Sequence, residues 1–462
     1  LYAFMSATKE RRDLLLSQRE PRFDAALDKQ IAEAADDFTR IALKAKAAKD
    51  YFLLVGPPGT GKTSCALKKM VETFYKEEGA QILLLSYTNR AVDEICKALS
   101  SIRPEVDFIR VGSELSCDEN YREHLIENEL ATCMRRTEVY ERINRCRILV
   151  GTVASISGKP ELFRLKHFDV AIVDEATQIL EPQLLGILCA KGENGKEGVG
   201  KFILIGDHKQ LPAVVLQNSE QSEVYDEALS AVGLKNLKDS LFERLYRTAR
   251  QHTDAHRTYD MLCRQGRMHP EVALFANQAF YEGRLLPVGL PHQLEDSGNI
   301  NRLSFYPSQP EPMGSSAKTN HSEAKIAARL AATIYKEHSE AFDASRTLGI
   351  ITPYRSQIAL IKKEIEALGI PELNQILIDT VERFQGSERD VIIYSFCVNY
   401  PYQLKFLSNL TEEDGILIDR KLNVALTRAR KQMLLTGVPT LLERNPLYKS
   451  LLKLIESLRN IA

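Results

Sequence analysis

A glycine-rich stretch carries the first residues that could do chemistry. GPPGTGKTS at 56–64 follows the apolar run YFLLV at 51–55. Its spacing fits GxxxxGKS/T, in which backbone N–H groups converge on a triphosphate at a helix N-terminus. We predict that Lys62 reaches the β- and γ-phosphate oxygens and that Thr63 gives its hydroxyl to Mg²⁺. An ordinary Gly/Pro turn is the alternative; the predicted nucleotide contacts are Gly56, Pro57, Pro58, Gly59, Thr60, Gly61, Lys62, Thr63 and Ser64.

Two acids close a second apolar run. Asp174 and Glu175 end the strand-like part of VAIVDEATQ at 170–178. The carboxyl ends of parallel strands line the ligand crevice, so both acids can face the glycine-rich loop. We predict that Asp174 holds Mg²⁺ together with Thr63, and that Glu175 takes the proton from the attacking water. An exposed acidic pair at the start of a helix is the alternative.

A third polar cluster follows the run KFILIGD. In GDHKQLP at 206–212, Gln210 lies a few residues beyond the strand. A neutral amide there can hydrogen-bond both water and a γ-phosphate, so we predict that Gln210 senses the phosphate. A simple turn ended by proline is the alternative.

Arginines that could stabilise a transferred phosphoryl group occur only in the second half of the chain. LNVALTRAR at 422–430 has helical spacing, which places Arg428 and Arg430 on opposite flanks of an apolar stripe. Arg267, in QGRMHP, is the other candidate. We predict that Arg267 and Arg428 approach the terminal phosphate when two domains close on the nucleotide. Surface salt bridges are the alternative.

The elements that must position these residues alternate between strands and helices, which predicts an α/β fold with parallel sheets. One series of strands is expected at 51–55, 81–87, 106–111, 147–152, 169–175 and 201–207, and a second at 347–354, 391–396 and 432–438. The predicted organisation is a helical lead-in at 1–50, one domain at 51–246 with a charged helical insertion near 112–146, and a second domain at 247–462.

Two segments interrupt this alternation. Residues 286–320 are rich in Pro, Gly, Ser and Asn, so we expect a long surface excursion with little helix. The insertion at 112–146 mixes both signs of charge, and either a solvated helical face or a lid over a bound strand fits that pattern.

Composition restricts the partners. Lys and Arg number 61 against 62 Asp and Glu, a net charge of −1, so a polyanion must be met by a local groove. Eight cysteines without a CxxC pair favour buried thiols in a reducing compartment over a metal site. No run is long enough to span a membrane and no signal peptide is recognised. We therefore expect a cytoplasmic protein, or a nuclear one in a eukaryote, and no oligomer is implied.

The order of the motifs resembles that of superfamily 1 helicases, in the 1B branch. It is most similar to the branch that holds the nonsense-mediated-decay RNA helicase and the helicase half of the replication nuclease-helicase. This resemblance implies two RecA-like domains with an ATP cleft between them, and ATP hydrolysis that drives 5′-to-3′ translocation and unwinding. The motifs are GPPGTGKT, SYTNRAVDEI, GTVASI, VDEATQ, GDHKQLP, QGRMHP, TPYRSQ, TVERFQGSERDVII and LNVALTRAR.

The resemblance also implies roles for single residues. Arg267 and Arg428 correspond to the paired γ-phosphate arginines, and Arg430 is expected to brace the same element. Glu388 resembles the acid that binds the ribose, and Gln30 the glutamine that reads adenine. The family usually has an aromatic residue where this chain has Gly266, so a stacking face for the base is missing there; Tyr354 is the candidate ring that could replace it.

Single-stranded DNA or RNA is the partner that the resemblance implies. The matching motifs place strand contacts at Thr88, Asn89, Thr152, Pro353, Tyr354 and Thr380. Small hydroxyl and amide groups suit phosphate contacts that are independent of sequence, although a loop-capping role explains each residue equally well. An ATP-gated clamp or nucleoprotein remodeller, and a nucleotide switch with no nucleic-acid role, are the alternative functions.

Overall fold

The computed structural model describes residues 2–193, 195–217, 219–251, 254–296, 298, 300–312 and 314–459. The chain divides into two compact units. Unit 1 comprises Leu1–Pro57, Gly61–His208 and Pro212–Leu262, and unit 2 comprises Pro58–Thr60, Lys209–Leu211 and Cys263–Ala462. Within the part described, no helix is both long enough and apolar enough to cross a bilayer.

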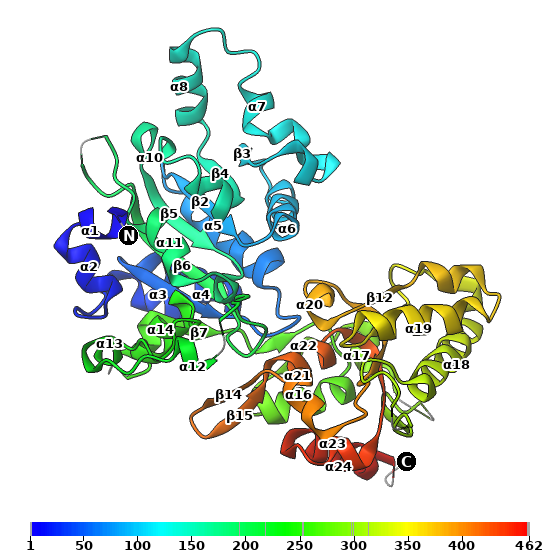
Figure 1. The fold of residues 1–462 in the computed structure, drawn as a ribbon. Helices are drawn as coiled ribbons and strands as arrows, with labels where there is room; N and C mark the ends of the chain where they lie inside the picture. The colour runs from blue at the N-terminus through cyan, green and yellow to red at the C-terminus, as the bar shows by residue number, and fades with distance from the viewer. Residues whose placement is uncertain are drawn as a thin grey trace. The chain divides into compact units, whose positions relative to one another are not determined.

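Unit 1 is built on a seven-stranded parallel sheet in the order β3-β4-β2-β5-β6-β1-β7 (Figure 1). Its strands are buried almost throughout, as expected when helices cover both faces. The strands are β1 Tyr51–Val55, β2 Ile82–Ser86, β3 Phe108–Val111, β4 Ile148–Thr152, β5 Phe168–Val173, β6 Val199–Gly206 and β7 Tyr259–Met261.

Alternate residues of β1 enter two separate cores. Leu53 and Val55 pack on one side of the sheet, and Phe52 and Leu54 on the other. The first core receives side chains from α2 Lys9–Leu15, α11 Glu181–Leu188 and α14 Leu241–Ala249, and the second from α4 Asp37–Ala47, α5 Lys68–Tyr75 and α6 Asn89–Ser100. The shorter helices of unit 1 are α1 Tyr2–Ser6, α3 Asp28–Ala32, α9 Val153–Ser157, α10 Leu162–Leu165, α12 Ser219–Ser222, α13 Glu227–Ala231 and α15 Ala255–Thr258.

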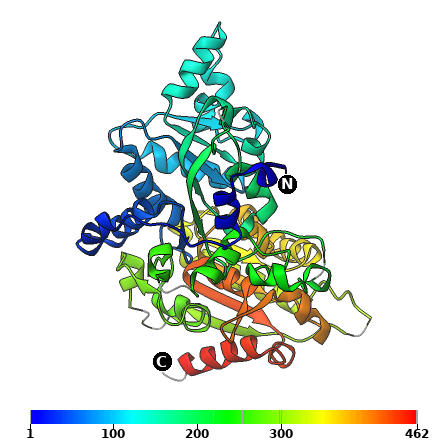
Figure 2. The same ribbon diagram turned by 90° about the vertical axis from the view of Figure 1, so that its left-hand side faces the viewer.

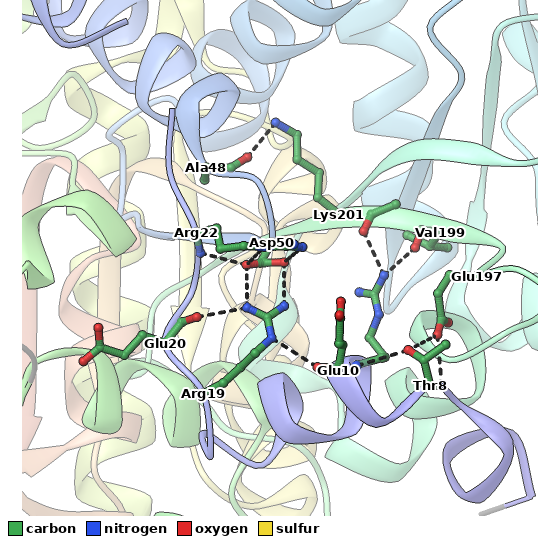
Figure 3. A network of polar contacts seen from close by, with 12 residues as sticks. Thr8, Glu10, Arg19, Glu20, Arg22, Ala48, Asp50, Glu197, Val199 and Lys201 are labelled. Carbon is green, nitrogen blue, oxygen red and sulfur yellow. Dashed lines mark hydrogen bonds and ion pairs between the residues drawn. The ribbon is translucent and has the colours of Figure 1, made fainter. Parts of the chain in front are cut away.

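The N-terminal segment is helical, and it is an integral part of unit 1. Asp50 is buried ahead of β1, where its carboxylate accepts hydrogen bonds from the guanidinium groups of Arg19 and Arg22 at 2.7–3.2 Å (Figure 3). Arg11 donates to the carbonyls of Val199 and Gly200 at 2.6 and 2.8 Å. These bonds tie the segment to the start of β1 and β6.

Unit 1 also extends further along the chain than 246. β7 pairs in parallel with β1, with Leu53 opposite Tyr259, so the division falls after Leu262. Between β3 and β4 the expected insertion forms short helices that project from the sheet (Figure 1): η3 Glu114–Ser116, η4 Glu119–His124, α7 Ile126–Glu129 and α8 Arg136–Arg145.

Unit 2 holds a five-stranded parallel sheet in the order β10-β16-β13-β11-β12, seen from a second side in Figure 2. The strands are β10 Leu303–Pro307, β11 Leu348–Ile351, β12 Leu377–Asp379, β13 Arg389–Ser395 and β16 Ala429–Gly437. One face is covered by α18 His321–Glu337 and α19 Arg355–Glu366, whose apolar residues share a core with β11 and β13. The predicted α/β class with two RecA-like parallel-sheet domains is confirmed.

The remaining elements of unit 2 flank this sheet. α16 contacts β16, and α24 contacts β10. The helices are α16 Pro270–Phe280, α17 Pro291–Leu294, α20 Val381–Phe384, α21 Leu404–Leu407, α22 Arg420–Leu426, α23 Pro439–Leu442 and α24 Pro446–Arg459. Two small sheets complete the unit: β8 Arg264–Gln265 with β9 Leu286–Pro287, and the hairpin β14 Leu410–Glu413 with β15 Ile416–Asp419.

Two local predictions were wrong. The segment 286–320 is more than a surface excursion, because β10 within it is an edge strand that pairs with β16. The helix predicted over 422–430 ends at Leu426, where the hydroxyl of Thr427 donates back to the carbonyl of Asn423 at 2.8 Å. β16 then begins at Ala429, so Arg430 lies on a strand.

Candidate active site

The glycine-rich loop connects β1 to a helix in unit 1. The N–H group of Gly56 donates to the carbonyl of Gly206 at 2.9 Å, which fixes the start of the loop beside the end of β6. Gly61 has φ of +76°, a conformation that favours glycine, and the helical segment Lys62–Leu67 follows it. A helix that starts there presents its first N–H groups to an anion.

Lys62 folds back over its own loop. Its Nζ donates to the carbonyl of Gly56 at 2.5 Å. A Cβ added at Gly56 would lie 2.1 Å from Cγ of Lys62, so only glycine leaves room for this side chain. The ammonium group is therefore held at the loop, where a phosphate would be bound.

Thr63 and Asp174 meet beneath the loop, as the sequence predicts. The hydroxyl of Thr63 donates to Oδ2 of Asp174, and Oδ1 of Asp174 accepts from the N–H of Glu175 at 2.9 Å. Burial raises the pKa of Asp174, whereas the Thr63 bond and the charge of Lys62 act in the opposite direction. A positive ion beside this carboxylate would offset the cost of its burial.

The oxygens of Thr63 and Asp174 fit Mg²⁺. This ion prefers hard oxygen ligands and is usually bound by one or two carboxylates together with substrate phosphates. Among the residues that the structure describes, no cluster of three or more His, Cys, Asp or Glu side chains could hold a metal alone. Thr63 and Asp174 would offer one hydroxyl and one carboxylate, and a bound phosphate would supply further oxygens.

Glu175 has an unusual backbone. Its φ of 54° is rare for a residue with a side chain, and such strain of about 1–3 kcal/mol is kept where the surroundings fix the conformation. The turn follows β5 directly, so Glu175 stands next to the buried Asp174 and is itself partly exposed. That position suits a base that must reach a water molecule.

Glu388 of unit 2 joins two of the predicted arginines. Its carboxylate accepts from Nε of Arg267 at 2.5 Å and lies 3.8 Å from Nε of Arg430. Burial would raise the pKa of Glu388, but Arg267, Arg430 and Arg428 outweigh it and lower the pKa. Arg430 also lies 3.6 Å from Asp390; because it stands on β16 and its ion pairs are with acids at the start of β13, it does not brace a helix as predicted.

Arg428 is almost fully buried in unit 2. Its Nε donates to the carbonyl of Val424 at 3.0 Å, and Nη1 donates to that of Ser387 at 3.4 Å. Nη2 donates to Oε1 of Gln210 at 3.3 Å; Gln210 belongs to the short segment Lys209–Leu211 of the same unit. Two groups predicted to act on the terminal phosphate are therefore neighbours.

The predicted strand contacts of unit 1 lie at the ends of two adjacent strands. Thr88 follows β2, where its hydroxyl accepts from the N–H of Ala91 at 3.2 Å and caps α6. Thr152 ends β4 and caps α9 through the N–H of Ser155 at 3.0 Å. Asn89 opens α6 and is partly exposed. Capping uses an acceptor lone pair, so it does not exclude donation by these hydroxyls to a phosphate.

The predicted strand contacts of unit 2 lie on neighbouring strands as well. Pro353 and Tyr354 follow β11, and Thr380 follows β12, its neighbour in the sheet. The hydroxyl of Tyr354 accepts from Nε2 of Gln403 at 3.2 Å. Thr380 precedes α20 and makes no side-chain capping bond there.

Comparison with known proteins agrees with this geometry. Residues 33–139 and 128–218 match one family model described as an AAA domain, and residues 237–440 match a second with the same description. DNA replication ATP-dependent helicase/nuclease DNA2 of Bos taurus is 28% identical over 98% of this chain. This chain belongs to the superfamily 1 helicases.

A second curated relative of this superfamily 1 chain is DNA polymerase alpha-associated DNA helicase A of Saccharomyces cerevisiae, which is 25% identical over 88% of the chain. The chain spans 42% of the length of the Bos taurus protein and 65% of the yeast protein. Arterivirus nonstructural protein 10 (helicase), solved in complex with DNA, aligns over 86% of this chain and 62% of that one, at 16% identity and a TM-score of 0.42. A score of that size carries no weight in the assignment.

The predicted adenine contact, Gln30, lies on the N-terminal segment of this superfamily 1 chain. Gln30 is exposed on α3. The residue of the N-terminal region that approaches the loop is Phe38, whose Cζ lies 3.6 Å from a Cβ built on Gly61. The sequence prediction did not single out Phe38, because a place in the first turn of a helix capped by Asp36 does not indicate which loop the ring will meet.

Gly266 is packed against aliphatic side chains of unit 2. A Cβ built on it would lie 3.2 Å from Leu290 and 3.4 Å from Val288. Both residues are about two-fifths exposed, at 41% and 44%. An aromatic side chain at 266 would displace them, so two aliphatic side chains occupy the space beside this position.

Proposed function

We propose that this chain is the motor region of an ATP-dependent helicase, in which ATP hydrolysis drives movement along single-stranded nucleic acid and separates duplexes. One observation carries the proposal: the hydroxyl of Thr63 bonds to the buried carboxylate of Asp174 beneath a complete glycine-rich loop. Hydroxyl, carboxylate and loop are the parts that a Mg²⁺-dependent triphosphatase needs.

The residues of unit 1 would share the work of hydrolysis. Lys62 exchanges the Gly56 carbonyl for phosphate oxygens, and the loop N–H groups bind the rest of the triphosphate. Mg²⁺ bound to Thr63 and Asp174 would supply positive charge to the phosphates. Glu175 takes the proton from the water that attacks the γ-phosphate.

Residues of unit 2 would complete the reaction. We propose that Gln210 orients the attacking water and that Arg267 and Arg428 stabilise the charge on the transferred phosphoryl group. Glu388 would bind the ribose, whose hydroxyl would compete with Arg267 for the carboxylate and displace it. That exchange would couple nucleotide binding to the freeing of an arginine.

The strand would be held by small polar groups at the carboxyl ends of strands in both units. These groups contact phosphates without reading sequence, which suits a protein that moves along its track. The two curated relatives are named for DNA, which supports DNA as the strand, and the branch supports 5′-to-3′ movement. Such a protein would act in the cytoplasm or, in a eukaryote, the nucleus.

The test is ATP hydrolysis measured without a strand and with single-stranded DNA or RNA oligonucleotides, followed by strand displacement on duplexes with 5′ or 3′ overhangs. We expect stimulation by a strand and displacement from a 5′ overhang. Stimulation without displacement from either overhang would favour an ATP-gated clamp or remodeller. Absence of stimulation by both nucleic acids would refute a nucleic-acid function and leave a nucleotide switch.

A further inference from the structure

Unit 2 exposes large aromatic side chains on the segment that follows β13. The chain turns through η8 Pro401–Gln403 and α21, where Tyr402 is 55% exposed and Phe406 is 63% exposed. Among large apolar side chains these are costly to leave in water, and neighbouring exposed rings on a short segment indicate a binding surface.

Two rings of this segment, those of Tyr400 and Tyr402, are nearly parallel. The centroids of Tyr400 and Tyr402 lie 5.8 Å apart, and their planes differ by 12°. Tyr400 is partly exposed and Tyr402 is exposed, so solvent reaches both rings of the pair. A flat, solvent-facing ring is the shape on which a nucleobase stacks.

A buried glutamine holds the segment in place. Oε1 of Gln403 accepts from the N–H groups of Asn399 and Tyr400, each at 2.9 Å. Its Nε2 donates to the carbonyl of Ala317 at 2.6 Å and to the hydroxyl of Tyr354 at 3.2 Å. A side chain bonded in this way fixes the rings before any ligand arrives, which lowers the entropy cost of binding.

The bond to Tyr354 joins the rings to the predicted strand contacts. Tyr354 follows β11 and the aromatic segment follows β13, and these two strands are paired in the sheet. Tyr354, Tyr400 and Tyr402 therefore stand at the same edge of unit 2. Thr380 belongs to this edge too, because it follows β12, the other neighbour of β11.

The charge beside the rings favours a polyanion. Arg355, next to Tyr354, and Lys405, next to Phe406, are exposed, and neither forms an ion pair with any residue that the structure describes. Glu382 lies near Phe406, but it is paired at 3.1 Å with Lys421, which donates to the carbonyl of Phe406 at 3.3 Å. Unpaired cations that alternate with rings suit a phosphate backbone carrying bases.

We propose that Tyr400, Tyr402 and Phe406 form a stacking platform for the bases of a single strand, with Arg355 and Lys405 on its phosphates. The proposal rests on the proposed function, because it names a base-contacting surface of the same strand path. Stacking on a ring tolerates every base, so the platform grips the strand without choosing sequence.

Strands with and without bases test the platform. Binding of fluorescein-labelled oligo-dT and of an abasic oligomer of equal length is followed by anisotropy. We expect the wild-type protein to bind oligo-dT about tenfold more tightly than the abasic strand. The double variant Tyr402→Ala with Phe406→Ala should lose most of that preference and keep its affinity for the abasic strand. Both side chains are exposed, so thermal unfolding should be unchanged.

Matched variants separate stacking from other effects. Tyr402→Phe keeps the ring and should keep the preference, as should Tyr225→Ala, which removes an 80% exposed tyrosine of unit 1. Lys405→Gln should weaken both strands equally and reduce the salt dependence. An unchanged preference in the double variant would overturn the platform and point to a protein partner for this surface. A wild-type protein whose ATPase no strand stimulates would instead refute the proposed function itself.

Discussion

A buried carboxyl group in unit 2 should make its stability depend on pH. Glu323, on α18, is fully buried, and its Oε2 accepts from the hydroxyl of Ser395 at 2.7 Å and the N–H of Cys397 at 2.8 Å. Oε1 accepts from the hydroxyl of Ser308 at 3.4 Å. Burial raises the pKa of Glu323 from its ordinary 4.5 to about 7, more than these bonds lower it.

The sign of the pH dependence follows from the number of protons that Glu323 binds in the folded and in the unfolded protein. Between the ordinary pKa of 4.5 and about 7, the folded protein keeps a proton on Glu323 that the unfolded chain has lost. The free energy of unfolding therefore falls as the pH rises through this range and levels off above it. A difference of about 2.5 pKa units corresponds to about 3 kcal/mol.

Glu323→Gln isolates this effect. The amide carbonyl can accept the bonds from Ser395 and Cys397, and the NH₂ group can donate to Ser308, so packing is kept while titration is removed. Urea unfolding followed by circular dichroism gives the free energy of unfolding of both proteins at pH 5 and pH 8. From pH 5 to pH 8, the difference between variant and wild type should shift by about 3 kcal/mol in favour of the variant. Glu337→Gln, at the exposed end of the same helix, should show no such gain. Equal differences at both pH values would refute the reasoning.

Three further changes test the site and its frame. Glu175→Gln should leave ATP binding intact and reduce turnover by at least about 10²-fold, because the proton acceptor is lost; near-normal turnover would assign that task to another group. Arg267→Lys should lower kcat by about 10²-fold with a smaller change in ATP affinity, and equal losses would contradict a transition-state role. Asp50→Asn should lower the free energy of unfolding of unit 1 by about 2 kcal/mol, an effect that is lost progressively as the pH falls below the ordinary pKa of Asp towards the lower pKa that Asp50 has beside Arg19 and Arg22 in the folded protein.

The glycine-rich loop and the acids Asp174 and Glu175 could be predicted because each lies in a short, contiguous sequence motif. β1 spans Tyr51–Val55, the run that the sequence marks, and Thr63 meets Asp174 although 111 positions separate them. The link is topological: parallel strands bring their carboxyl ends to one edge of a sheet, so a loop and an acid at two strand ends must be close.

The errors arose where local pattern and sheet pairing disagree. LNVALTRAR has helical spacing to its end, but Ala429 pairs with Arg389 and starts a strand there. Sheet pairing therefore overrides the local helical preference of these residues. β7 has three residues and includes the charged Asp260, so no strand pattern marks it; Arg40 and Lys44 pair with that carboxylate. The approach of Phe38 to Gly61 has no local signature at all.

Lys62 already has a bonding partner within its own loop, the carbonyl of Gly56. A phosphate that binds the ammonium group must first break this hydrogen bond. The net contribution of Lys62 to the free energy of ATP binding is therefore the energy of its bond to the phosphate minus the energy of its bond to the neutral carbonyl. Replacing Lys62 by alanine would remove both contacts together. The loss of ATP affinity measured for such a variant would therefore be smaller than the full strength of the lysine–phosphate bond. The same substitution would also change the flexibility of the turn.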